Sequence, residues 1–160
     1  MNNRHNAVIV VNVPKPTTIK PPPFNSDEYQ NYPADRYNPQ SNQCLRQVIF
    51  RALDACRPLE NGNLPGWLHQ GTPDWFPDFA HQNGKRSIAF NLIGSNKDIG
   101  YGLNNAAEQV LGSIVAYFNH GLRDERRDRR NVFNHVYLLV SGRRHEQPRK
   151  IEQAWTTAWK

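Results

Sequence analysis

Three short apolar runs along this 160-residue chain predict β-strands. They are residues 7–13 (AVIVVNV), 87–93 (SIAFNLI) and 132–140 (VFNHVYLLV). Runs of this length, rich in β-branched residues and bounded by Gly or Pro, are typical of strands in a buried or partly buried sheet. The last run has two distinct faces, one with Phe133, His135, Tyr137 and Leu139 and the other with the intervening residues.

Three longer segments predict amphipathic helices, because their apolar residues recur three and four positions apart. The predicted apolar faces are Leu45, Val48, Ile49, Ala52, Leu53 and Cys56; Ala107, Val110, Leu111, Ile114, Val115 and Phe118; and Ile151, Ala154, Trp155, Ala158 and Trp159. With the strands, this order predicts an α+β fold: a small mixed sheet of about three strands with two or three packed helices.

Residues that favour helix caps and helix ends mark the expected boundaries of these helices. Ser41 opens the first helix, and Pro58 ends it. Asn105, with Glu108 three residues later, has the form of a capping box, and Gly121 suits the position just beyond the C-terminus. Pro148 fits the first position of the final helix.

Residues 14–40 predict an extended arm outside the packed domain. They carry seven of the twelve prolines and interleave them with Tyr29, Tyr32 and Tyr37. Such a segment has polyproline character and is either loose or laid across another surface. We therefore divide the chain into residues 1–40, a strand and arm, and residues 41–160, a single α+β domain. The three tyrosines are candidate partner-binding residues, for self-assembly or for another protein.

Charge is concentrated at the C-terminal end. Residues 121–160 hold ten of the twenty Lys and Arg and contribute +5 of the formal net charge of +6. On a helix, Arg123, Arg126, Arg127 and Arg130 would share one face, and a second cluster follows at Arg143, Arg144, Arg149 and Lys150. Arg forks match phosphate and carboxylate groups, so both clusters are candidate anion-binding residues for nucleic acid or another polyanion.

The same arginines also permit a purely structural interpretation. Asp124 can pair with Arg127, and Glu125 can pair with Arg129, as in a solvated helix end held by salt bridges. The predicted strand between the clusters spans about 30 Å, so the clusters lie at its opposite ends. No helix-turn-helix, zinc-finger or RNA-binding signature accompanies them.

Cys44 and His135 are the candidate catalytic residues of an alternative function. Cys44 is predicted in the first turn of a helix, where free N–H groups favour a thiolate, and His135 lies on a later strand. This order resembles the layout of papain-like cysteine peptidases and amidases, although their local signatures are absent. A third, orienting group would come from Asn134, Asp74 or Asp78. The structural alternative is a cysteine beside the apolar face and a sheet histidine.

Other classes of site find no support in the sequence. Residues 94–102 lack the Gly-Lys-Ser/Thr of a phosphate-binding loop and the third Gly of a dinucleotide fingerprint. The six histidines have no metal-ligand spacing with cysteine, so we expect neither metal nor cofactor. No apolar run approaches the roughly 20 residues of a membrane span, and two cysteines without a signal peptide suggest an intracellular, reduced protein.

The composition therefore favours a non-enzymatic binding or assembly protein. A basic C-terminal quarter and an arm that needs an outside surface suit a subunit of a particle or nucleoprotein complex, including viral or phage-type structural proteins. Aromatic side chains can also stack on unpaired bases, although their place on apolar faces favours packing.

Overall fold

The computed structural model of the chain describes residues 11–19, 31–56, 86–96, 98–139 and 146–158. In order, these form a short 3-10 helix η2 (Ala34–Arg36), α1 (Pro39–Ala55), β1 (Arg86–Asn91), α3 (Leu103–Asn119), α4 (Arg123–Val132), β2 (Phe133–Leu139) and α5 (Glu146–Ala158). The expected mixture of helix and strand is confirmed. The described residues form a two-stranded parallel sheet, β1–β2, rather than the three strands expected.

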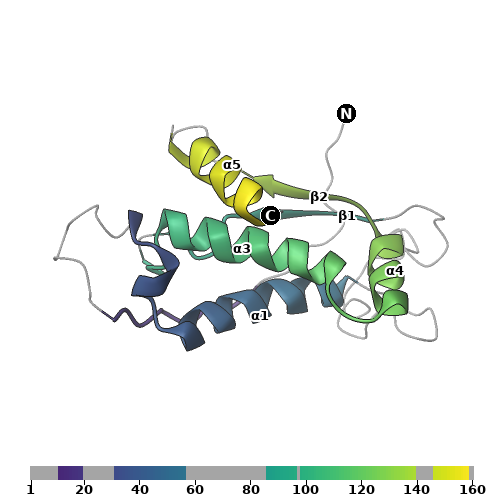
Figure 1. Ribbon diagram of the computed structural model, residues 1–160, viewed down its shortest axis with the longest axis horizontal. Coiled ribbons are helices and arrows are strands. Elements are labelled where there is room, and N and C mark those ends of the chain that lie inside the picture. Colours follow the sequence, from purple (N-terminus) through teal and green to yellow (C-terminus); the bar gives the residue numbers. More distant parts are fainter. Residues whose placement is uncertain (1–10, 20–30, 57–85, 97, 140–145, 159–160) are drawn as a thin grey trace, which may run out of the picture.

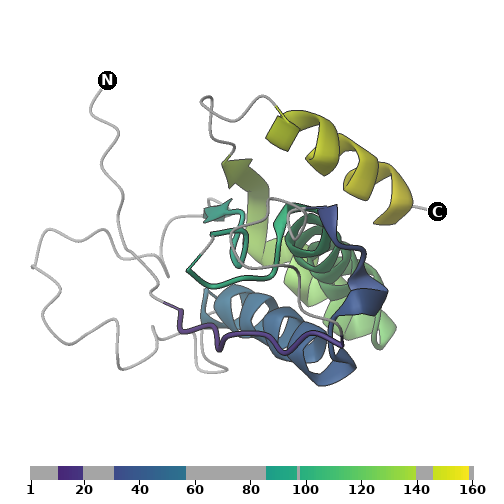
Figure 2. The same ribbon diagram turned by 90° about the vertical axis from the view of Figure 1, so that its left-hand side faces the viewer.

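Helix α3 is the centre of the fold. Figures 1 and 2 show α1 beside it, α5 across it and the β1–β2 sheet covering a further side. It therefore buries residues nearly all round, including Leu103, Ala106 and Tyr117, which the predicted stripe did not contain. The predicted positions Ala107, Val110, Leu111 and Ile114 are buried, whereas Val115 and Phe118 are half-buried.

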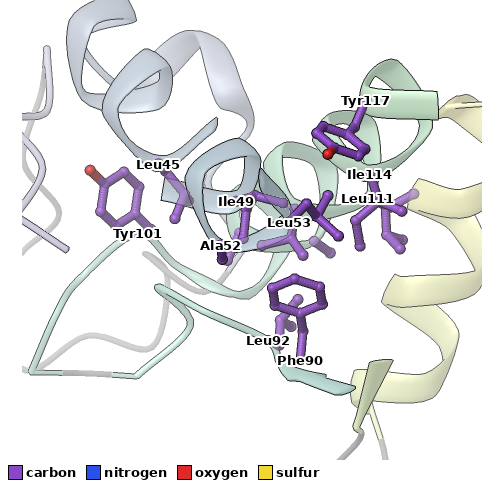
Figure 3. Packing of buried hydrophobic residues seen from close by; sticks show 14 of the residues in the cluster. Leu45, Ile49, Ala52, Leu53, Phe90, Leu92, Tyr101, Leu111, Ile114 and Tyr117 are labelled. Carbon is purple, nitrogen blue, oxygen red and sulfur yellow. The ribbon is translucent and has the colours of Figure 1, made fainter. Parts of the chain in front are cut away.

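The hydrophobic core lies between α1, α3 and the inner face of β1. From α1, Leu45, Ile49, Ala52 and Leu53 are buried, as expected. Figure 3 shows Phe90 and Leu92 facing these residues from below, with Leu111 and Ile114 of α3 beside them. The core thus joins all three elements into one packed unit.

Helices α1 and α3 run parallel and in register. Three polar contacts join them: Asn105 donates to Asn42 (2.8 Å), Arg46 donates to Gln109, and Tyr117 donates to Asp54 (2.8 Å). Each pair is separated by 63 residues in the sequence. A constant separation requires that both helices advance in the same direction at the same rate.

The seam between the two helices, defined as Asn42 of α1 with Asn105, Gln109 and Ser113 of α3, is buried although it is polar. Asn105 is fully buried, and its Oδ1 accepts a hydrogen bond of 3.0 Å from the side chain of Gln109 one turn later. Another turn on, the Ser113 hydroxyl donates to the Gln109 carbonyl (2.6 Å). Buried polar groups without partners are costly, so this chain of contacts fixes the register of the two helices.

Three helix boundaries differ from the sequence expectations. Asn38, not Ser41, caps α1, with its side chain accepting from the Gln40 N–H (3.0 Å). Helix α3 begins after Gly102, whose φ of 68° suits glycine, so the proposed cap Asn105 is inside the helix. Pro148 is the third residue of α5, still within the first turn, where its missing N–H costs no hydrogen bond. Gly121, with φ 102°, is confirmed just beyond the end of α3.

Two described parts of the predicted arm pack against the start of α1. Thr18 and Tyr37 form an antiparallel bridge, and the Thr17 N–H donates to the Ser41 hydroxyl (3.0 Å). Residues 11–13 have no assigned strand, but Val11 and Val13 pack against the core while Asn12 is exposed. Residues 7–10 of the expected first strand, and residues 20–30 of the arm, lie outside the described residues.

The buried seam makes a testable contribution to stability. We expect Asn105→Leu to lower the free energy of unfolding by about 1–3 kcal/mol, because it leaves buried polar groups of Asn42 and Gln109 without their partner. The measurement is urea unfolding followed by circular dichroism. Asn104→Leu is the matched control, since Asn104 makes one exposed hydrogen bond, to the Asn31 carbonyl. Equal destabilisation by both substitutions would contradict the role of the seam.

Candidate functional site

The arginine run forms a separate helix, α4, that turns back on the end of α3 (Figure 1). Arg129 donates to the Tyr117 carbonyl (2.9 Å) and to the His120 carbonyl (3.1 Å). Arg130 donates to the Phe118 carbonyl (3.2 Å), and Arg126 makes a longer contact of 3.4 Å with the Asn119 carbonyl. These three arginines therefore cap the C-terminus of α3.

These contacts provide donors for the carbonyls at the end of α3. The last four carbonyls of a helix have no partner within it, and they form the negative end of the helix dipole. In α3 the first of them, at Ala116, accepts from the His120 N–H (2.8 Å), and the arginines satisfy the other three. The Arg129 guanidinium also lies 4.6 Å from the centre of the Tyr117 ring, within cation–π range.

The expected anion-binding face is therefore only partly free. Arg126 and Arg130, two of its four predicted members, donate to α3. Arg123 and Arg127 are exposed, and Arg127 forms solvent-exposed ion pairs with Asp124 (3.4 Å) and Asp128 (3.8 Å). The Asp124 pair matches the sequence expectation.

The expected pair between Glu125 and Arg129 does not form. Glu125 instead accepts from the Leu122 N–H (3.1 Å) at the start of α4. This is the returning half of a capping box, made without a side-chain acceptor at Leu122. Arg129 therefore bonds to carbonyls at the end of α3, whereas Glu125 caps the N-terminus of α4.

Two of the four residues of the second basic cluster, Arg149 and Lys150, are among the described residues. Arg149 is exposed and Lys150 half-buried, both near the start of α5. Arg143 and Arg144 lie outside the described residues. Strand β2 runs from the end of α4 toward α5, so the described cations lie before and after it in the chain, as expected.

The outer face of β2 carries an exposed aromatic pair between these cations. His135, Tyr137 and Leu139 alternate along the strand, and Tyr137 and Leu139 are 51% and 52% exposed. The rings of His135 and Tyr137 are stacked, with centres 5.5 Å apart and planes at 20°. Ala89 and Asn91, which pair with Tyr137 and Leu139 across the sheet, are also exposed. The sequence predicted the two faces of this strand but did not indicate which of them is exposed.

Cys44 and His135 are not joined as a catalytic pair. Since α1 begins at Pro39, Cys44 is its sixth residue, beyond the free N–H groups of the first turn that were expected to activate it. Burial raises the pKa of Tyr101 to about 12, and Cys44 contributes to this rise in the same direction. Within the described part of the chain, no hydrogen bond links Cys44 to His135, which stacks on Tyr137.

The orienting groups considered for that pair cannot be placed. Asp74 and Asp78 lie outside the described residues, as does the side chain of Asn134. Over the described ranges, no three His, Cys, Asp or Glu side chains are grouped so as to hold a metal ion. None of the helices described above is long and apolar enough to cross a membrane.

The candidate partner-binding tyrosines have different environments. Tyr37 is 1% exposed and stacks on Tyr101, with ring centres 6.2 Å apart, so its ring belongs to the interior of the fold. Tyr32 is half-buried and meets the edge of Tyr37 at 6.5 Å. Tyr29 lies outside the described residues. The described part of the arm therefore uses its tyrosines to pack against its own domain.

The arginines of α4 should differ in their contribution to stability, because only some of them cap α3. We expect Arg129→Ala to lower the free energy of unfolding by about 1–3 kcal/mol, because charged hydrogen bonds to the carbonyls of Tyr117 in α3 and of His120 at its C-cap are lost. The matched control is Arg127→Ala, expected to cost less than about 0.5 kcal/mol, since exposed ion pairs contribute little. Urea unfolding measures both, and similar values would rule out the capping role.

Comparisons with known proteins reveal no relatives of this chain. No protein-family model matches it, and neither does any curated protein or solved structure. The function is therefore inferred from its own side chains and surfaces.

Proposed function

We propose that this protein is a non-enzymatic, single-stranded nucleic-acid-binding subunit of a nucleoprotein complex or particle. Its contact surface is the β2 stripe, defined as His135 and Tyr137 on the outer face of β2 with the exposed or half-buried cations Arg123, Arg127, Arg149 and Lys150 on the flanking helices. The observation that carries the proposal is the exposed stack of His135 on Tyr137.

The chemistry of the stripe suits an unpaired strand. Aromatic rings on an open face stack on bases of any sequence, and cations along a track contact the phosphates. Arg123 and Arg127 precede β2, whereas Arg149 and Lys150 follow it. The chain as a whole is basic, with a net charge of +6, which favours encounter with a polyanion. The acids Asp124 and Asp128 offset part of the positive charge on α4.

The open sheet face gives a second reason to expect a partner. Parallel sheets are normally covered on both faces, and two strands alone are marginal in water. Helix α3 lies on the inner side of β1–β2, whereas Tyr137 and Leu139 remain half exposed on the outer side. A bound strand of nucleic acid would cover this face. The alternative of a cysteine hydrolase is supported by no contact within the described residues.

The aromatic pair can be tested with a ring-retaining control. We expect Tyr137→Leu to weaken binding of a fluorescent single-stranded oligothymidylate by about 1–3 kcal/mol, the value of one base–aromatic stack. Tyr137→Phe keeps the ring and should bind as the parent protein does. Fluorescence anisotropy at low salt measures both. No binding by the parent protein, or an equal loss in both variants, would refute the proposal.

The cations can be tested through salt dependence. Each phosphate contact contributes about −0.7 to the slope of log affinity against log salt concentration for single strands. We expect Arg149→Gln to make this slope less negative by about that amount. Arg51→Gln removes another exposed arginine, on α1 and away from the stripe, and should leave the slope unchanged. Identical slopes for all three proteins would exclude Arg149 from the contact.

A further inference from the structure

A groove of about 680 Å³ lies at the carboxyl ends of β1 and β2. This is within the range of ligand sites, and the carboxyl end of parallel strands is where open sheets usually bind their ligands. The lining comes from both strand ends, from the turn after β1 and from the N-terminal segment. The lining residues are Val11, Asn12, Val13, Asn91, Leu92, Ile93, Gly94, Ser95, Asn96, Ile99 and Leu139.

The chemistry of this lining points to a neutral, extended occupant. None of the lining residues that the structure describes is charged, although the chain carries +6, so this part of the lining offers nothing to a polyanion. Its apolar side chains are interspersed with the amides of Asn12, Asn91 and Asn96, which can bond to a peptide backbone. Such a lining fits an added β-strand, which gains affinity from main-chain hydrogen bonds and apolar side chains.

One wall of the groove is a short extended segment, residues 11–13. Residues 11–13 contain no helix, turn or bend, and they make no backbone hydrogen bond to another described residue. Their side chains alternate as in a strand, with Val11 and Val13 packed inward and Asn12 exposed. Asn91 and Ile93 line the same groove. An extended segment in this groove can therefore pair with residues 11–13.

The chain itself contains a segment of the required kind. Residues 7–10, Ala-Val-Ile-Val, lie outside the described residues and lead directly into the groove wall at Val11. They are uncharged, mostly β-branched, and extend over about 13 Å as a strand. Residues 7–11 contain no Gly, Pro, Asn or Asp, the residues that favour a tight turn, so their sequence favours pairing with another chain over folding back beside residues 11–13.

We infer that the groove binds residues 7–10 of a second copy of this chain, forming a two-fold symmetric dimer. In antiparallel pairing of residues 7–13 with their symmetry copy, Val10 lies opposite Val10 of the other chain. Ile9 then lies opposite Val11 of the other chain, on the face that Val11 and Val13 turn inward. Each copy then both donates a segment and receives one, so the assembly closes as a dimer. The inference is independent of the nucleic-acid proposal, since the groove is uncharged.

The salt dependence of the two associations distinguishes them. Two copies of charge +6 repel each other, so added salt should favour the dimer by screening that repulsion. Binding of nucleic acid should weaken under the same change. A salt titration of mass and of oligonucleotide affinity therefore gives opposite trends when both proposals hold.

The decisive experiment compares two truncations by size-exclusion chromatography with light scattering. The full chain should be a dimer at micromolar concentration, a chain lacking residues 1–10 a monomer, and a chain lacking only residues 1–6 a dimer. Circular dichroism checks that each variant is folded. A full chain that is monomeric at every concentration, or a dimer that survives loss of residues 1–10, would overturn the inference.

Two point substitutions keep the test independent of truncation. Ile9→Lys puts a charge into the uncharged groove and should shift the full chain toward monomer. Ile19→Lys is the matched control at a site that is 70% exposed and outside the groove, and it should leave the mass unchanged. An unchanged dimer in both variants would contradict the proposed occupant. Equal loss of the dimer in both would show a charge effect unrelated to the groove.

Discussion

The fold depends on the burial of α3 between α1, α5 and the sheet. The last carbonyls of such a helix have no partner within the helix, and they form the negative end of its dipole. The problem is increased by the parallel arrangement of α1 and α3, because the contact between Asp54 and Tyr117 places the C-terminal ends of both helices together. Helix α4 supplies the missing donors, because Arg126, Arg129 and Arg130 bond to the last carbonyls of α3.

This use of arginine changes the meaning of the basic C-terminal quarter. A count of charges treats all the arginines of α4 as equal, yet three of them bind carbonyls of the same chain. The cations that remain for a partner, such as Arg123 and Arg149, are fewer and lie on either side of β2 in the chain. Between them the strand exposes an aromatic pair, so the candidate interface depends on stacking as well as on charge. The uncharged groove at the strand ends is a chemically different surface, suited to a peptide segment.

Much of the local structure could be predicted from the sequence, because it depends on short-range periodicity. Leu45, Ile49 and Leu53 recur at helical spacing and are buried, and Gly121 ends α3 with the positive φ that its sequence position suggested. The buried Asn105 was misinterpreted as a cap, since a polar residue near the start of a helix usually serves the free N–H groups there. Only its partner Asn42, on a distant helix, makes burial favourable.

Local patterns in the chain were enough to predict α1, α3, α5, both strands and most of the apolar faces of α1 and α3, because periodicity and turn residues act over a few positions. They did not predict that Trp155, on the expected apolar face of α5, is 43% exposed. The sequence also placed the cations on either side of one strand. Contacts between distant segments, in contrast, set which arginines donate to α3, which face of β2 is exposed and that Cys44 and His135 share no hydrogen bond. These properties depend on contacts between residues far apart in the chain, such as Tyr117 with Asp54, and no local pattern specifies them.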